Sequence, residues 1–371
     1  MSETKDVVVV GGGIVGLSIA LAAAERGARV IVLERGKPGR EASWAGAGII
    51  YAWSLSHAKT GFDWLMAKGA ELHASTASRF LESTGIDTEF RRSGELLVTK
   101  PEATDPAELD RDLSALNSHG SAARRITMEQ ARALEPELSS ALRGAVEVPE
   151  VARFRPPRHL RALELACPRA KVRVISEDAV LSIASKDGHV IGVRTETALY
   201  TGDHVVLAAG AWTATLLAGL GINAPIRPLR GQIALLKTPS PILQRVISTG
   251  YEYLVPRDDG RVLVGSTRED VGFDKRTTAA AIRGLLASAA VMAPALEGAD
   301  VEMTWAGLRP ATPDGMPIIG AIPGHAGLWI AAGHTRYGLH LGPITGAVMA
   351  ELMISGKTEV DLSMLSLARF S

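Results

Sequence analysis

Cysteine is nearly absent from the 371-residue sequence, which contains only Cys167. One thiol forms no internal disulfide and builds no multi-cysteine metal or iron–sulfur site, so we expect neither, and we expect no metal centre. A lone cysteine of this kind is usually buried and inert. The first strand follows a short polar segment without a basic or apolar leader, which predicts a cytoplasmic protein.

Neither sign of charge is in excess, because 40 basic residues balance 40 acidic ones and no run of like charges stands out. We therefore expect no nucleic-acid partner and no polybasic membrane patch. No segment reaches the ~18 uninterrupted apolar residues that a membrane-crossing helix needs, so we expect no integral membrane segment. The length favours two or three domains.

A glycine-rich turn follows the first apolar run, DVVVV, and precedes a helical pattern. An unbroken run of valines suits a strand that is covered on both faces in a parallel sheet. Gly11, Gly13 and Gly16 form a GxGxxG pattern, and Glu34 ends the second strand about 20 residues later, where its carboxylate can bind a ribose. The pattern predicts a dinucleotide site. The alternative, a turn that only links strand to helix, leaves Glu34 unexplained.

Later segments predict a discontinuous arrangement of two domains. The run DHVVLAAGAWT, residues 203–213, is typical of a late strand of the nucleotide-binding sheet, and strands around PLRGQIALLK, YEYLVPR and RVLVGST form an antiparallel insertion. A last helix is expected to start near Pro343. We predict an α/β fold in which a doubly wound, Rossmann-like domain (1–90, 145–220 and 300–371) is interleaved with an antiparallel-sheet α+β substrate domain (91–144 and 221–299).

One arginine, Arg309, lies within the stretch TWAGLRPATPDGMPIIG. A guanidinium keeps its proton at any usable pH, so an inward-facing one must meet an anion or another acceptor. From the residues alone, a solvated loop arginine and a structural salt bridge both stay open.

Six stretches, taken in order, resemble the D-amino-acid oxidase family of flavoenzymes, and within it the glycine oxidases. They are GGGIVG with Glu34, REASWAGAGI, VVLAAGAW, YLVPR, WAGLRPATPDGMPIIG and AAGHTRYGLHLGPITG. The resemblance covers nearly the whole chain. It implies FAD as the cofactor, held without a covalent bond because the C-terminal region has no cysteine, and a homo-oligomer, a tetramer in that family.

The resemblance also implies which residues form the site. The cofactor contacts it implies are Gly11, Gly13, Gly16, Glu34, Ser43, Gly46, Gly48, Gly210, Gly333, Gly338 and Leu339. It assigns to Arg309 a bidentate pair with the carboxylate of an amino acid, a geometry that suits a planar guanidinium. Tyr253 would help to hold that carboxylate, and Arg336 would be a second arginine near the flavin. For Tyr253, a role in the core stays open.

The implied reaction is the oxidative deamination of glycine, sarcosine or small D-amino acids by molecular oxygen. Its products would be a keto acid (glyoxylate from glycine), ammonia or a primary amine, and hydrogen peroxide, with a role in making the thiazole of thiamine. Two alternatives are a D-amino-acid dehydrogenase with another electron acceptor and a flavin-binding protein without turnover, which should lack Arg309. His334 and His340 are expected to be structural rather than general bases.

Two positions depart from the family pattern. Arg268 stands where the family tends to have an apolar residue, and Tyr251 stands where at least one type of glycine oxidase has histidine. If Arg268 lines the pocket, a second cation there favours a substrate with an additional carboxylate, such as iminodiacetate or an acidic D-amino acid. Alternatively, Arg268 pairs with Glu269, Asp270 or solvent at the sheet edge.

Overall fold

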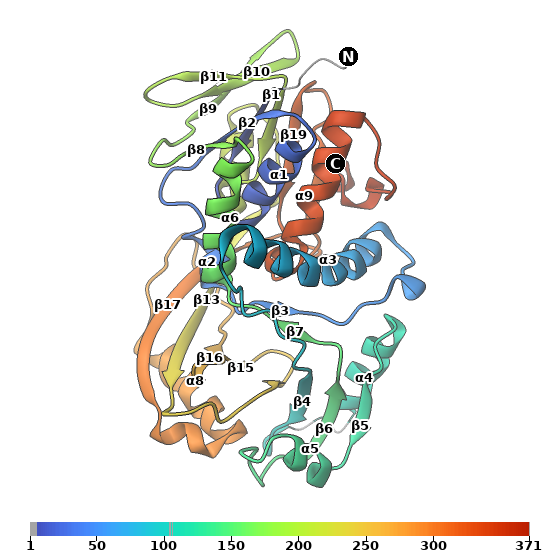
Figure 1. The fold of residues 1–371 in the computed structure, drawn as a ribbon, viewed down its shortest axis with the longest axis vertical. Helices are drawn as coiled ribbons and strands as arrows, with labels where there is room; N and C mark the ends of the chain where they lie inside the picture. Colours follow the sequence, from blue (N-terminus) through green and yellow to red (C-terminus); the bar gives the residue numbers. More distant parts are fainter. Residues whose placement is uncertain (1–5, 104, 106, 371) are drawn as a thin grey trace.

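The computed structural model describes residues 6–103, 105 and 107–370. The polar segment 1–5, from which we expect no leader, lies outside the described residues. A six-stranded sheet lies in the upper half of Figure 1 and an eight-stranded sheet in the lower half. This arrangement confirms the predicted α/β class with a Rossmann-like domain. Among the described helices, none combines the length and the apolar character needed to cross a membrane.

The six-stranded sheet is parallel except for the pair β18 and β19. In spatial order its strands are β18 (Ile318–Ala321), β19 (Leu328–Ala332), β12 (His204–Leu207), β1 (Asp6–Val10), β2 (Arg29–Leu33) and β8 (Arg173–Ile175). Val7 and Val9 of β1 pack on the helical side, and Val8 and Val10 pack on the other. Burial on both faces accounts for the unbroken run of valines.

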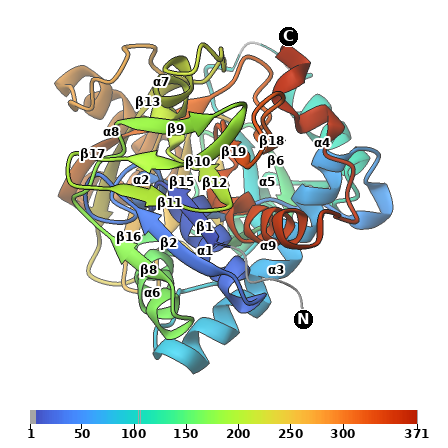
Figure 2. The ribbon, with the colours of Figure 1, turned by 90° about the horizontal axis from the view of Figure 1, so that it is seen from above.

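Helices cover one face of this sheet and a small sheet covers the other (Figure 2). The helices are α1 (Ile14–Glu25), α3 (Gly61–Thr84), α6 (Pro156–Arg169) and α9 (Gly338–Ser355). The small antiparallel sheet consists of β9 (Ser182–Lys186), β10 (His189–Arg194) and β11 (Leu199–Thr201). Pro156 occupies the first position of α6, where a missing N–H costs nothing.

The eight-stranded sheet is antiparallel except for the pair β14 and β4. In order its strands are β17 (Asp300–Ala311), β13 (Arg227–Lys237), β16 (Arg261–Gly265), β15 (Tyr253–Pro256), β14 (Val246–Ser248), β4 (Glu95–Thr99), β6 (Gly144–Val148) and β5 (Arg124–Ile126). The other α-helices are α2 (Ala42–Ala45), α4 (Glu108–Ser118), α5 (Met128–Leu134), α7 (Thr213–Ala218) and α8 (Ala279–Met292). The strands β3 (Ile49–Ile50) and β7 (Ala152–Arg153) form a short antiparallel pair.

Strands β6 and β17 both belong to the eight-stranded sheet. The predicted boundaries assign residues 145–220 and 300–371 to the FAD-binding domain. Most of β6 and all of β17 therefore fall within the predicted FAD-binding domain, although both strands pair in the eight-stranded sheet. The division of the chain into domains at those boundaries stays a prediction.

The expected start of the last helix near Pro343 is wrong, because α9 begins at Gly338 and Pro343 lies inside it. The reason is close packing of α9 on α1. A Cβ atom added to Gly342 would lie 2.9 Å from Ile14, and one added to Gly346 would lie 2.6 Å from Ser18. This contact outweighs the preference of proline for a first turn, and it directs the start of α9 toward the space between the sheets.

Arg257, which directly follows β15, ties the two halves together. Its side chain is buried, and its guanidinium donates to the carbonyl oxygens of Phe154 at 2.9 Å and Ala47 at 2.8 Å. Burial, with the nearby charge of Arg153, lowers the pKa of Arg257 to about 9, so the group still carries its charge at neutral pH. A buried guanidinium satisfied by carbonyl oxygens from another part of the chain fixes both segments in place.

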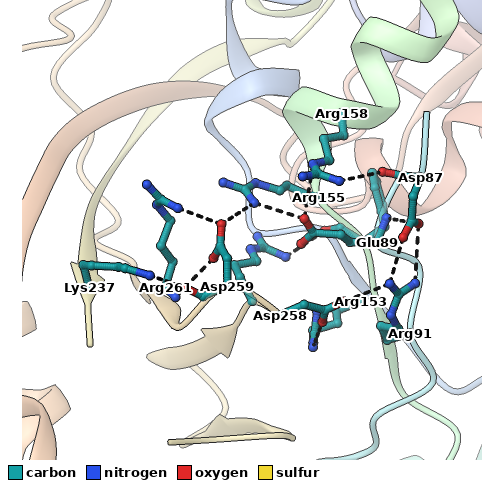
Figure 3. A network of polar contacts seen from close by, with 12 residues as sticks. Asp87, Glu89, Arg91, Arg153, Arg155, Arg158, Lys237, Asp258, Asp259 and Arg261 are labelled. Atoms are coloured by element: carbon teal, nitrogen blue, oxygen red, sulfur yellow. Dashed lines mark hydrogen bonds and ion pairs between the residues drawn. The ribbon is translucent and has the colours of Figure 1, made fainter. Parts of the chain in front are cut away.

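Ion pairs lie on both segments that this contact joins, and Figure 3 shows them. Arg155, just before α6, contacts Glu89 at 3.0 Å and Asp259 at 2.9 Å, and Arg153 contacts Asp258 at 2.9 Å. The two aspartates belong to the turn between β15 and β16. Arg153 and Glu89 are buried whereas the two aspartates are partly exposed, so these pairs add to the connection that Arg257 makes.

Three buried histidines lie between α3, α6 and α9. The rings of His73 and His159 lie 5.0 and 4.9 Å from the ring of Phe154. His340 donates from Nε2 to the carbonyl of Met66 at 2.7 Å and accepts the N–H of Tyr51 at Nδ1. Burial lowers the pKa of His73 to about 4 and that of His340 to about 3, and it also lowers the pKa of His159. These histidines are neutral parts of the core.

The fold should therefore lose stability as the pH falls below about 6.5, before the carboxylates begin to take up protons. The histidines have lowered pKa values in the folded state, so as the pH falls through about 6.5 only the unfolded chain takes up protons, and stability is lost. In the variant His159→Phe, the unfolded chain takes up one proton fewer. The substitution breaks no hydrogen bond at Nε2 of His159, which has no partner among the described residues. Between pH 7 and 5.5 we expect the variant to lose about 1 kcal/mol less free energy of unfolding than the parent, measured by denaturant titration. Equal losses would contradict a neutral His159.

Candidate active site

A cavity of about 420 Å³ lies between the two large sheets and is lined by residues of both. Most of the residues predicted for the site line it: Gly11, Gly13, Glu34, Ser43, Gly46, Gly48, Gly210, Tyr253, Arg309, Arg336, Gly338 and Leu339. Gly16 and Gly333 do not. Gly16 packs against Gly11 behind the turn, and a Cβ atom added to Gly333 would lie 2.6 Å from Thr312.

The carboxyl ends of β1, β2 and β12 form one wall of the cavity. Gly11 follows β1 with φ +108°, and a Cβ atom added there would lie 2.5 Å from the carbonyl oxygen of Ala208. Glu34 follows β2, and its carboxylate accepts the N–H groups of Gly12 at 2.8 Å and Gly36 at 2.9 Å. The turn and the carboxylate therefore hold each other in place at the edge where doubly wound folds bind nucleotides.

Two helix N-termini face the same cavity. Gly13 precedes α1, and the N–H of Ile14 donates to the Ser43 hydroxyl at 3.0 Å. Gly338 and Leu339 begin α9, and neither helix has an acidic residue in its first turn. Free amides at a helix start favour an anion such as a diphosphate.

Small residues make room between these helix ends for a flat ring. A Cβ atom added to Gly46 would lie 2.5 Å from Leu339 and would displace its side chain. Gly48 has φ +77°, and a Cβ atom added there would lie 2.2 Å from the carbonyl oxygen of Phe154, so a larger side chain does not fit at Gly48. The carboxylate of Glu34, the two helix starts and this narrow wall together fit a flavin dinucleotide. Gly11, Gly13, Glu34, Ser43, Gly338 and Leu339 would hold it.

Arg309 projects from β17 across Gly231 of β13, and a Cβ atom added to Gly231 would overlap its guanidinium. Nη1 donates to the carbonyl oxygen of Thr267 at 3.1 Å, and Nη2 donates to the Ser266 hydroxyl. No carboxylate in the described ranges lies within ion-pair distance of Arg309. Neutral acceptors position the guanidinium, and its charge is left for a ligand.

Tyrosines surround this end of the cavity. Tyr253 of β15 lies across Gly265 of β16, where an added Cβ atom would come within 2.6 Å of its hydroxyl. Arg336 donates to the Tyr337 hydroxyl at 2.8 Å, and its guanidinium lies 4.9 Å from the Tyr337 ring and 5.8 Å from the Tyr51 ring. Cation–π contacts hold Arg336 against the two rings.

Among the described residues that line the cavity near Arg309, none is a proton acceptor suited to neutral pH. His334 lines the cavity, but burial lowers its pKa to about 3, and its Nε2 contacts the Thr345 hydroxyl at 3.2 Å. Burial raises the pKa of Tyr51 to about 12, so the phenol stays protonated. The carboxylates of the described residues that line the cavity are Glu34, beside the glycine turn, and Glu41, which pairs with Arg35 and Lys275.

The sequence alone does not identify several residues that shape the candidate site. Gly231 and Gly265 make the space that Arg309 and Tyr253 fill, and Tyr51 and Tyr337 hold Arg336. A glycine inside a strand pattern, as in PLRGQIALLK, is a signal of close approach by another group. The partner of each glycine depends on pairing between strands, which the sequence pattern does not give.

Replacing Glu34 by glutamine should weaken the binding of the dinucleotide. The amide keeps the shape but presents a donor to the N–H of Gly12 or Gly36 and loses the charge that binds a ribose. We expect the Kd for FAD to rise about tenfold or more, measured by ultrafiltration and flavin absorbance. Glu25→Gln, an exposed α1 residue paired with Arg79, is the matched control. Equal Kd values for the two variants would contradict this role.

Comparisons with known proteins agree with this geometry. The family model DAO, FAD dependent oxidoreductase, matches residues 6–352. The chain is 36% identical to a glycine oxidase of Pseudomonas putida, over 96% of this chain and 97% of that protein. It is 38% identical to a glycine oxidase of Pseudomonas aeruginosa, over 97% of each chain. The crystal structure of glycine oxidase from Geobacillus kaustophilus superposes with a TM-score of 0.92 at 32% identity, over 99% of both chains. This chain belongs to the DAO family of FAD-dependent oxidoreductases, and its cofactor is FAD.

Proposed function

We propose that this flavin-dependent oxidase oxidises glycine, sarcosine and small D-amino acids with molecular oxygen. The products are the keto acid (glyoxylate from glycine), ammonia or a primary amine, and hydrogen peroxide. The observation that carries the proposal is Arg309, a cation that lines the cavity beside Tyr253 and has no acidic partner among the described residues. The glycine oxidases that share 36 and 38% identity with the chain support glycine as a substrate.

Binding of the substrate carboxylate is the task of two side chains. Arg309 donates from its guanidinium to both carboxylate oxygens, the geometry in which arginine binds most strongly. Tyr253 adds a hydroxyl donor from strand β15, which β13 and β16 separate from β17 in the same sheet. Two fixed donors restrict rotation of the substrate and hold its α-carbon in one orientation. Bound FAD supplies the two-electron acceptor.

The substrate amine loses its proton to water in this proposal. His334 and Tyr51 stay in their neutral forms, and no carboxylate of the described residues lines the cavity near Arg309. The start of α9 at Gly338 contributes the positive end of a helix dipole, which favours added negative charge nearby. Electrostatics and positioning therefore carry the protein's share of catalysis. A homo-oligomer and a role in thiamine thiazole biosynthesis stay predictions.

Anaerobic mixing with glycine tests the proposal. The visible absorption band of the FAD-bound protein should bleach and should return with one equivalent of hydrogen peroxide when air is admitted. Bleaching that air does not reverse would contradict an oxidase and would favour a dehydrogenase. A flavin that neither glycine, sarcosine nor D-alanine bleaches would contradict the proposed substrates.

Adding one methyl group at Gly231 should weaken binding of the substrate carboxylate. The new Cβ atom would overlap the Arg309 guanidinium and displace it. We expect KM for glycine to rise about tenfold or more in Gly231→Ala, because a charge-assisted hydrogen bond is worth about 1.5–3 kcal/mol. FAD content should not change. Gly284→Ala is the control, since nothing lies within 4 Å of a Cβ atom added at that glycine of α8. An unchanged KM in Gly231→Ala would show that Arg309 does not bind the carboxylate.

A further inference from the structure

We propose that Arg268 forms a second carboxylate-binding site beside Arg309, so that amines with two carboxylates, such as iminodiacetate or D-aspartate, are preferred over neutral analogues of the same shape. The inference rests on the proposed function, because it names the substrate class for the same cavity.

Arg268 and Arg309 lie at the same end of the cavity. Both line it, and the guanidinium of Arg309 contacts Thr267 and Ser266, the two residues that precede Arg268. The segment is fixed on its other side as well, because Glu269 and Arg230 exchange both backbone hydrogen bonds. The backbone that carries Arg268 is therefore held in place next to the first carboxylate site.

The acidic neighbours of Arg268 are already used by other side chains. Glu269 accepts from Arg230 and, at 2.8 Å, from Gln232. Asp270 pairs with Arg227. In the part of the chain that the structure describes, Arg268 forms no ion pair. It therefore does not pair with Glu269 or Asp270, and its side chain is exposed to solvent. Its charge is available to a ligand.

Arg268 contacts the ring of Tyr251, and this contact leaves the N–H groups of its guanidinium free. Its guanidinium carbon lies 5.7 Å from the ring of Tyr251, which also lines the cavity and is 63% exposed. A cation–π contact at this distance uses the face of the ring and no N–H group. Arg268 is itself exposed, so its long side chain can move to meet an anion.

The balance of charge at this end of the cavity favours a substrate with two negative groups. Arg309, Arg268 and Arg336 line the cavity. The carboxylates among the described lining residues are Glu34, beside the glycine turn, and Glu41, which pairs with Arg35 and Lys275. Arg336 is engaged with Tyr337 and Tyr51. A substrate with one carboxylate would pair with Arg309 alone and leave Arg268 without a partner, whereas a second carboxylate would pair with it.

The reaction keeps the same form for both kinds of substrate. Iminodiacetate, oxygen and water would give glyoxylate, glycine and hydrogen peroxide. D-Aspartate, oxygen and water would give oxaloacetate, ammonia and hydrogen peroxide. In each case one C–N bond is oxidised and then hydrolysed, and oxygen takes up the two electrons.

Pairs of substrates with and without the second carboxylate test the inference, and D-aspartate and D-asparagine also match in shape. In the FAD-bound parent, kcat/KM for D-aspartate should exceed that for D-asparagine at least tenfold, and kcat/KM for iminodiacetate should exceed that for sarcosine. In Arg268→Met both ratios should fall about tenfold, and Arg268→Lys should recover part of the loss. Arg283→Met replaces an exposed arginine of α8 that does not line the cavity, and its ratios should equal those of the parent.

The outcomes separate this inference from the proposed function. A parent that oxidises glycine but shows unchanged ratios in Arg268→Met, or that fails to oxidise either dicarboxylate, overturns the second site and leaves the oxidase activity in place. A parent that produces no peroxide from any of these amines overturns the proposed function, and the second site with it. FAD content and circular dichroism confirm that each variant is folded.

Discussion

The contact of Arg257 with two backbone carbonyls is the constraint on which the site depends. The residues that we propose to hold FAD lie mainly at the edge of one sheet, and Arg309 and Tyr253, which we propose to bind the substrate, belong to the other. The proposed catalysis therefore requires a fixed distance between the two sheets. Arg257 directly follows β15, the strand of Tyr253, and it donates to Ala47 in the small-residue wall and to Phe154 before α6. Trp305 of β17 adds a second link, because its indole N–H donates to Ala45 at 3.1 Å. Buried carbonyl oxygens without these donors would each cost about 1–3 kcal/mol, which opposes separation of the two halves.

Neutral groups position the charged ones at the substrate end. Arg309 is held by a hydroxyl and a carbonyl and has space because position 231 is glycine, so its charge is oriented without being neutralised. A carboxylate in place of Ser266 would fix the guanidinium as well but would compete with the substrate. The nearby histidines are uncharged as well, because burial disfavours their cationic forms and lowers their pKa values.

Local patterns in the sequence predict the cofactor half well and the substrate half less well. Gly11 and Glu34 act through neighbouring segments of chain, so the spacing of strand, turn and helix is enough to place them. The partners of Arg309 come from β13 and from the segment after β16, and the register between distant strands decides which residue lies opposite. The sequence pattern also gives the wrong start for α9, because the packing of α9 on α1 is a contact between distant segments that the local pattern does not contain. For Arg268, only the structure reveals that its acidic neighbours are bound elsewhere.

The central claim is that Arg309 binds the carboxylate of the substrate. Titration with glycolate, which has the carboxylate of glycine but no amine, measures this binding alone through the visible spectrum of bound FAD. The parent should show a saturable spectral change that glycine competes away, and Arg309→Met should bind glycolate at least about tenfold more weakly with unchanged FAD content. Equal Kd values for parent and variant would contradict the account, because the carboxylate would then be bound elsewhere.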